Sequence, residues 1–292
     1  MENNNPGISG IRENMGDELS LILFDGRVEY LRSGDIESLG KAIGRYFAEA
    51  GDSVRKDSPE LFAVYSDAAA RGFRSEETLV SPEGMRFYKG MDAVPESFTD
   101  IYNCYFDSEI IRLGKNEVFV DGGAQDLFTS FRFSKKAGGK FRAIYAFEPS
   151  GDNYGECMGN RALFDGEIHI SALALSDHTA VAGFTEDRQC SRIDEGSDSY
   201  VLTVSLDDCM EGIEPTFIKL HIEGGEYAAI LGAEKTISRC APRLAVCIDH
   251  CPEDVVRIPQ KLLEYESGYR FYLRHYSTSV TETVLYAVKN RK

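Results

Sequence analysis

The chain has 292 residues, of which 42% are hydrophobic and 27% charged, a composition typical of a soluble globular protein. Its formal net charge of −16 makes nucleic acid, anionic membranes and polyphosphate substrates unfavourable partners, because proteins bind these through lysine and arginine. No apolar run approaches the ~20 residues that span a bilayer, and residues 1–7 lack the basic and apolar segments of a signal peptide, so we expect a cytoplasmic protein.

The first hundred residues are expected to form a helical cap or an association region, and whether the protein forms a homo-oligomer is left open. Residues 1–18 are rich in Asn, Gly and charge, which predicts a flexible tail. Two apolar segments on either side of Asp25 and Gly26 predict a β-hairpin over residues 21–31.

Residues 35–73 show a helical pattern that is interrupted once. Asp35 is expected to cap the first helix and Gly51 to end it, and Ser58-Pro59 is a typical helix start. Residues 74–100 show no regular pattern, apart from one expected strand at 85–88.

From residue 101 to 292, apolar runs of strand length alternate with helical segments, which predicts a mostly parallel sheet with helices on both faces. Helices are expected from about residue 126 and over 225–238 and 252–266. Strands are expected at 117–121, 143–147, 168–175, 200–206 (beside the main sheet), 216–222, 244–248, 269–275 and 283–288. Because about half a dozen residues join the last two strands, these two should be antiparallel. This is the plan of the Rossmann-like class I methyltransferase fold.

Ligands of open α/β sheets bind at the carboxyl ends of the strands. The first strand ends in Asp121-Gly122-Gly123-Ala124, where the glycines allow a tight turn and a close approach of backbone to ligand. The next helix then presents free N–H groups. Glu148 ends the neighbouring strand and is placed to accept hydrogen bonds from two ribose hydroxyls. Together these features favour a nucleoside-binding site.

An NAD(P)-dependent oxidoreductase would share this layout, but its pyrophosphate requires Gly-x-Gly-x-x-Gly at the first turn. This chain has Asp-Gly-Gly-Ala-Gln-Asp-Leu there, so that class is disfavoured. An acidic residue at the strand end suits a cofactor without phosphate, such as S-adenosylmethionine with its cationic amino and sulfonium groups.

Histidines follow several of the later strands, and histidine suits proton transfer near neutral pH. We hypothesise that His221 or His250 is a general base and that His275 or Glu223 orients the acceptor. Lys219 is expected to pair with Glu223 or with Asp249 nearby. The seven cysteines are expected to be reduced, and no metal site is expected, because no second Cys/His pair lies at ligand spacing.

Several short motifs occur in a characteristic order. They are residues 117–124, 145–149 with Asn153, 174–177, 206–208, Phe217-Ile218-Lys219 with Ile222-Glu223-Gly224 and Glu226, and 273–276. In these motifs the chain resembles the FkbM family of methyltransferases, from about residue 102 to the end. The resemblance implies a class I fold, S-adenosylmethionine as cofactor, and methylation of a hydroxyl on a sugar or another small molecule.

The resemblance also implies site residues by position. Glu223 and Glu226 would lie near the point of methyl transfer. The residues that would contact or adjoin the cofactor are Asp121, Gly122, Gly123, Ala124, Glu148, Asn153, Leu175 and Ser176.

The chain departs from the family pattern at Leu127, where the family usually has Gly, and at His221, where it usually has Asp. A leucine at the first place is expected to obstruct the pocket. These departures support an alternative, a non-catalytic binding or scaffold protein of methyltransferase fold. The favoured function is O-methylation of a small-molecule or sugar hydroxyl.

Overall fold

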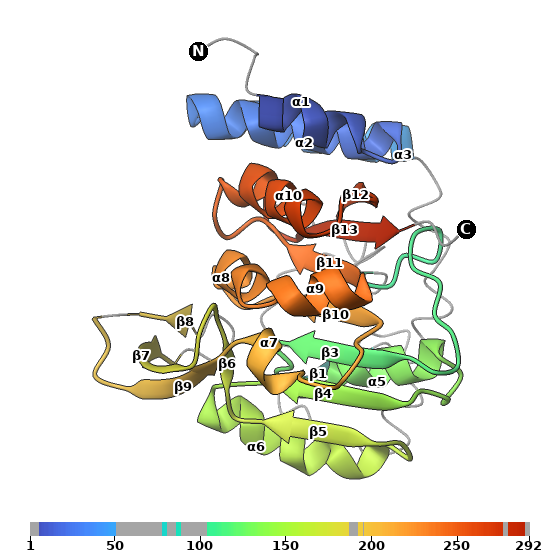
Figure 1. The fold of residues 1–292 in the computed structure, drawn as a ribbon. Helices are drawn as coiled ribbons and strands as arrows, with labels where there is room; N and C mark the ends of the chain where they lie inside the picture. Colours follow the sequence, from blue (N-terminus) through green and yellow to red (C-terminus); the bar gives the residue numbers. More distant parts are fainter. Residues whose placement is uncertain are drawn as a thin grey trace.

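The computed structural model describes residues 6–50, 78–80, 86–88, 104–186, 192–194, 196–276 and 280–289. At its centre lies a seven-stranded sheet with the order β12-β13-β11-β10-β3-β4-β5 (Figure 1). The strands are β3 (Val118–Gly122), β4 (Ala143–Phe147), β5 (Ile168–Ser171), β10 (Phe217–Leu220), β11 (Arg243–Cys247), β12 (Tyr269–His275) and β13 (Thr283–Lys289). Only β13 runs antiparallel to its neighbours in this sheet. The predicted class I methyltransferase plan is therefore confirmed.

Helices cover both faces of this sheet. They are α5 (Phe128–Lys136), α6 (Gly151–Asn160) with the 3₁₀ turn Arg161–Leu163, α8 (Glu226–Leu231), α9 (Glu234–Cys240) and α10 (Asp254–Tyr265). Val118 and Val120 share a hydrophobic cluster with α8, α9 and α10, whereas Phe119 between them stacks on Phe133 of α5 at 4.4 Å. A strand that alternates between two buried faces in this way reads as a continuous apolar run.

The helix expected over 225–238 is two helices, α8 and α9, because the chain packs closely at Gly232. A Cβ at Gly232 would lie 2.1 Å from the carbonyl oxygen of Ser176. This close contact with the segment after β6 explains why the chain turns there.

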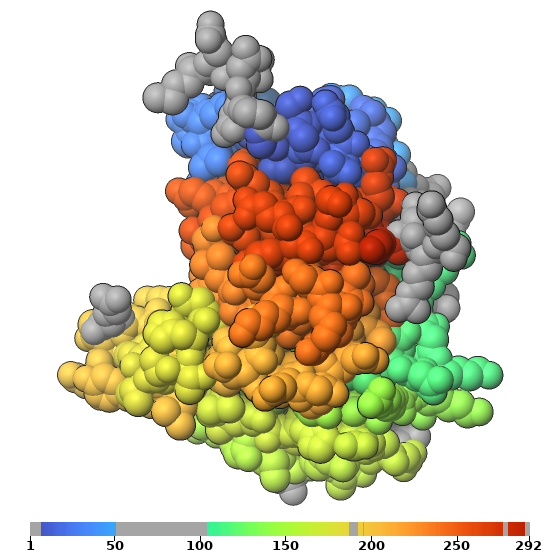
Figure 2. Space-filling model, in the orientation of Figure 1, coloured from blue at the N-terminus to red at the C-terminus, as the bar shows by residue number. Residues whose placement is uncertain are grey.

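A smaller sheet with the order β6-β9-β7-β8 lies toward the carboxyl ends of β3, β4 and β5 and projects from one side of the molecule (Figures 1 and 2). Its strands are β6 (Ala174–Leu175), β7 (Ala180–Thr185), β8 (Arg192–Ile193) and β9 (Tyr200–Val204). The single strand expected over 168–175 is thus β5 and β6, which belong to different sheets. The expected strand beside the main sheet is β9, but it ends before Leu206, which begins α7 (Leu206–Cys209) after the cap Ser205. The sequence analysis did not predict β7 and β8.

The N-terminal segment is helical where a flexible tail and a hairpin were expected. Its helices are α1 (Pro6–Glu13), α2 (Glu18–Ser33) and α3 (Ile36–Ala50). The tail prediction is wrong for residues 6–18, since Ile11 and Met15 are buried. The hairpin prediction is wrong because Gly26 serves helix packing: a Cβ there would lie 2.2 Å from the Cβ of Ala42 on α3. The expected role of Asp35 is confirmed, because its carboxylate accepts the N–H of Glu37 at the start of α3.

Two short strands, β1 (Thr78–Val80) and β2 (Arg86–Tyr88), form an antiparallel pair. The strand expected at 85–88 is confirmed as β2, whereas β1 was not predicted. The expected helix from Ser58, the cap at Gly51 and the boundary at residue 100 lie outside the described residues.

The N-terminal helices pack on the β12 edge of the sheet (Figures 1 and 2). Phe271 of β12 donates its N–H to Asn14 and accepts the N–H of Gly16. Leu23 and Phe24 of α2 are fully buried in the same hydrophobic cluster as the sheet. Within the described residues, none of the helices combines the length and apolar character needed to cross a membrane.

Candidate cofactor and acceptor site

A cavity of about 200 Å³ opens at the carboxyl ends of β3, β4 and β10 and is bordered by β6, β7 and β8. Seven of the residues proposed from the sequence line it: Gly123, Ala124, Glu148, Asn153, Leu175, His221 and Glu223. The other four proposed residues, Asp121, Gly122, Ser176 and His250, are not among its lining residues.

The glycine turn after β3 forms the floor of this cavity. Gly123 has φ +76°, and a Cβ there would lie 1.9 Å from the carbonyl oxygen of His221. The N–H groups of Gly123 and Ala124 both donate to the carbonyl of Phe147 on β4. Only glycine can occupy this position without displacing backbone. The turn therefore brings backbone to the cavity wall.

Asp121 is fully buried behind the turn instead of facing the cavity. Its carboxylate accepts the hydroxyl of Ser130 at 2.7 Å and lies 3.1 Å from Nζ of Lys219. Lys219 also donates to the carbonyls of Gly122 and Gly123. The expected pairing of Lys219 with Glu223 or Asp249 is wrong, because β3 and β10 run in parallel register and place Lys219 opposite Asp121. This buried ion pair holds the glycine turn in place.

Glu148 is the buried carboxylate at the end of β4, with 4% of its surface exposed. It accepts the N–H groups of Gln125 and Ser150 at 2.8 and 3.1 Å and the side-chain amide of Asn153 at 3.4 Å. Burial raises the pKa of Glu148, and these hydrogen bonds offset the rise only in part. A carboxylate has about four lone-pair sites, so Glu148 retains capacity for a ligand hydroxyl.

Leu127 does not obstruct the cavity, contrary to the expectation from the sequence. Its side chain is fully buried in the hydrophobic cluster of Phe119 and Phe131, and it is absent from the cavity lining. Its φ of +71° is left-handed, a conformation that glycine adopts without strain. This backbone conformation accounts for a glycine at the same place in the family pattern.

Two histidines and a glutamate form a cluster at the other end of the cavity. Glu223, whose φ is +53°, lies between them: its carboxylate is 3.2 Å from Nε2 of His221 and 3.3 Å from Nε2 of His250. Nδ1 of His221 is 2.5 Å from the hydroxyl of Tyr105, and Nδ1 of His250 is 3.1 Å from the carboxylate of Glu226. All ring nitrogens of the pair therefore have neighbours.

The charges in this cluster are strongly coupled. Burial alone raises the pKa of Glu223, but hydrogen bonds from His221 and His250 outweigh it and lower the pKa to about 2. Burial alone lowers the pKa of His250, but Glu223 and Glu226 raise it to about 11. The pKa of His221 is also raised, because Glu223 outweighs burial. His250 is therefore protonated at neutral pH and faces away from the cavity, which corrects its proposed role as a base.

His275 is not part of the site, which corrects its proposed role in orienting the acceptor. It is fully buried under α3, where its ring lies edge-on to Tyr46 and Phe47 and its Nδ1 is 2.7 Å from the hydroxyl of Thr283. The strand end carries it toward the N-terminal helices, because β12 is the edge strand on which they pack.

The structure adds residues that the sequence did not indicate. Tyr105 reaches the cavity from the segment before β3, and Glu282 reaches it from the loop between β12 and β13. Both have positive φ, of 74° and 67°, a conformation that is strained for such side chains. No spacing in the sequence marks either residue, since both arrive through tertiary contacts.

The parallel order of the sheet, the single antiparallel strand β13 and the site at the strand ends define a class I methyltransferase fold. Residues 121–271 match the methyltransferase FkbM domain. The chain belongs to this family, whose cofactor is S-adenosylmethionine. No curated protein matches the sequence.

The fold is similar to that of methyltransferase FkbM from Methylobacillus flagellatus, with a TM-score of 0.65 and 19% identity over 97% of this chain and 58% of that chain. The present chain thus spans little more than half the length of that protein. Fibrillarin from Aeropyrum pernix, solved with bound S-adenosyl-L-methionine, gives a TM-score of 0.40 at 10% identity over 60% of this chain and 67% of that one.

Proposed function

We propose that this protein transfers a methyl group from S-adenosylmethionine to a hydroxyl oxygen of a small molecule or sugar. The carrying observation is that one cavity joins two different chemical ends. One end is made by the Gly123 turn and Glu148, and the other by His221 and Glu223. A methyltransferase needs this combination, because cofactor and acceptor must meet in line.

The cofactor end fits a nucleoside. The close backbone approach at Gly123 leaves no room for a side chain and so exposes peptide groups to a ligand. Glu148 would hold the ribose hydroxyls, Asn153 would steady that carboxylate, and Leu175 would lie against the adenine. When bound, S-adenosylmethionine supplies an activated methyl group on a cationic sulfonium.

The acceptor end positions a hydroxyl and removes its proton. His221 and Glu223 both line the cavity, and Tyr105 holds the far side of the His221 ring. We assign proton uptake to the His221–Glu223 pair. Phe128 and Phe147 supply apolar wall, which helps to exclude water. Holding the oxygen in line contributes the larger share of the acceleration.

The setting of the reaction is proposed to be the cytoplasm, with neither nucleic acid nor membrane as partner. The net charge of −16 supports the absence of nucleic acid. The six cysteines among the described residues are all free, which suits a reducing compartment.

Calorimetric titration with S-adenosylmethionine and S-adenosylhomocysteine tests the cofactor end. We expect the native protein to bind both and Glu148→Ala to weaken binding at least ~100-fold, because two or more hydrogen bonds to a charged group are lost. The exposed Glu211→Ala is the matched control and should bind as the native protein does. Native protein that binds neither compound would contradict the proposal.

Turnover then separates an enzyme from a binding protein. A screen of sugars and small hydroxylated compounds with methyl-labelled cofactor should find an acceptor, and His221→Gln should lower its methylation at least ~100-fold while cofactor binding is kept. The non-catalytic alternative rested on Leu127 and His221. Leu127 lies outside the cavity, so His221 is the one departure still in its favour.

A further inference from the structure

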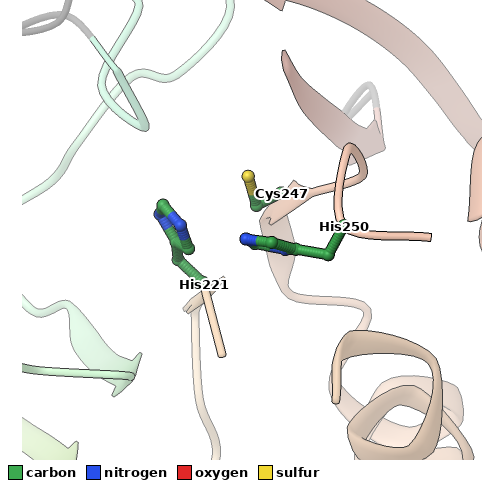
Figure 3. Close-up of side chains that lie close together, drawn as sticks. All are labelled: His221, Cys247 and His250. Atoms are coloured by element: carbon green, nitrogen blue, oxygen red, sulfur yellow. The ribbon is translucent and has the colours of Figure 1, made fainter. Parts of the chain in front are cut away.

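Three side chains that bind transition metals meet beside the acceptor end of the cavity. They are His221 after β10, Cys247 at the end of β11, and His250 three residues later (Figure 3). One potential ligand atom of each lies within 4.8 Å of those of the other two. Tetrahedral zinc places such atoms about 3.5 Å apart, so the three would close by roughly 1 Å around an ion.

The surroundings of the two histidines resemble the outer shell of a metal site. Metal-bound histidines almost always hold their second nitrogen through a carboxylate or another polar partner. Here Nδ1 of His250 is 3.1 Å from Glu226, and Nδ1 of His221 is 2.5 Å from the hydroxyl of Tyr105. The Nε2 atoms of both rings are then left to face a common point, which the carboxylate of Glu223 now occupies.

The local charge also favours a cation. Glu223, Glu226 and Asp249 surround the three side chains, and Glu282 adds a fourth carboxyl group from the cavity wall. Glu226 is fully buried and Cys247 donates its thiol proton to Asp249 at 2.8 Å. A dication bound to one thiolate would carry a net charge of +1 among these acids, which offsets part of their repulsion.

We infer that His221, Cys247 and His250 bind a divalent transition-metal ion of the zinc type through two imidazole nitrogens and a thiolate. Coordination replaces the proton of the Cys247 thiol, which is released to solvent. Of the three ligands only His221 lines the cavity, so the open fourth position lies on the cavity side.

The role of this ion rests on the proposed function. Bound at the fourth position, the acceptor hydroxyl becomes more acidic, as water does on catalytic zinc. Glu223 is then the member of the His221–Glu223 pair that takes the proton, since His221 is committed to the ion. The metal site therefore gives the replacement of the family's Asp by His221 a chemical purpose.

Cobalt titration of the chelator-stripped full-length chain tests the site without any turnover. Co²⁺ favours the same ligands as zinc and reports a thiolate ligand through a charge-transfer band. We expect one Co²⁺ per chain, and we expect Cys247→Ser to remove the band. His250→Gln should weaken cobalt binding by about 10-fold or more. Cys209→Ser, a partly buried cysteine on α7, is the control and should keep both band and affinity.

Two results would overturn the inference: native protein that binds no stoichiometric Co²⁺, or a thiolate band that persists in Cys247→Ser. If Cys247→Ser does not fold, the affinity of His250→Gln decides in the same way. Titration of the stripped chain with S-adenosylhomocysteine keeps the two proposals apart. Cofactor binding without a metal site sinks only this inference, and metal binding without cofactor binding sinks only the proposed function.

Discussion

Gly123 shows how much of the site depends on one missing side chain. We expect Gly123→Ala to abolish cofactor binding and to destabilise the fold by about 3 kcal/mol, because its methyl group meets backbone at His221 and its φ is left-handed. Gly138→Ala is a matched control, since its φ is +65° with no atom near the added Cβ. It should cost about 1 kcal/mol and leave cofactor affinity unchanged. Urea denaturation and calorimetry measure both effects, and equal losses in the two variants would contradict the close-approach argument.

Leu127 trades backbone strain against burial. We expect Leu127→Gly to destabilise the protein by about 2 kcal/mol, because loss of a buried leucine costs more than relief of the left-handed backbone returns. Cofactor affinity should stay within about twofold of the native value, since the side chain lies outside the cavity. The Leu127→Ala variant keeps the strain and should be at least as unstable. A large gain in cofactor affinity in Leu127→Gly would show that the leucine does close the pocket.

Helix α2 supports the site from a distance through Arg27. This buried guanidinium donates to the carbonyl of Val280 and to the hydroxyl of Thr283, which flank Glu282 in the loop that reaches the cavity. We expect Arg27→Ala to lower the free energy of unfolding by about 3 kcal/mol, since two hydrogen bonds to a charged donor are lost. It should also weaken acceptor binding more than cofactor binding, because Glu282 belongs to the acceptor end. The exposed Glu29→Ala on the same helix should change stability by less than ~0.5 kcal/mol.

The whole molecule should lose stability in acid through two ion pairs that tie its layers together. Asp17 lies 2.7 Å from Arg274 of β12, and Glu117 pairs with Arg243 of β11. Burial alone would raise the pKa of both carboxyl groups, but the hydrogen bonds from their arginines outweigh it and lower both values. A lowered folded-state pKa means that the contribution is complete above the unfolded value of about 4 and is lost as pH falls through the folded value.

Denaturation midpoints measured between about pH 6 and pH 2.5 test this coupling. The native protein should become progressively less stable below about pH 4. The double variant Asp17→Asn with Glu117→Gln should start from lower stability at pH 6 and show a flatter dependence, because those two protonation sites are gone. A native profile as steep as that of the double variant would exclude these pairs as the cause.

The central sheet could be predicted from the sequence because its signals are local. Strands such as β4 and β11 are short apolar runs, and the glycine turn and Glu148 follow directly from the ends of their strands. The same local reasoning failed at α2, where Gly26 and Asp25 resemble a turn. Only contact with Ala42 of α3 shows that this glycine permits two helices to approach.

What the sequence by itself determined is the order of elements, the family and the cofactor end of the site, since each rests on residues adjacent in the chain. The tertiary structure decided the rest. Parallel register placed Lys219 beside Asp121, the left-handed backbone at Leu127 accompanies a side chain buried in the core, and sheet order brought His221 of one strand next to Cys247 and His250 of another. No spacing rule reveals such a cluster, because residues on neighbouring parallel strands are separated in sequence by whole crossover connections.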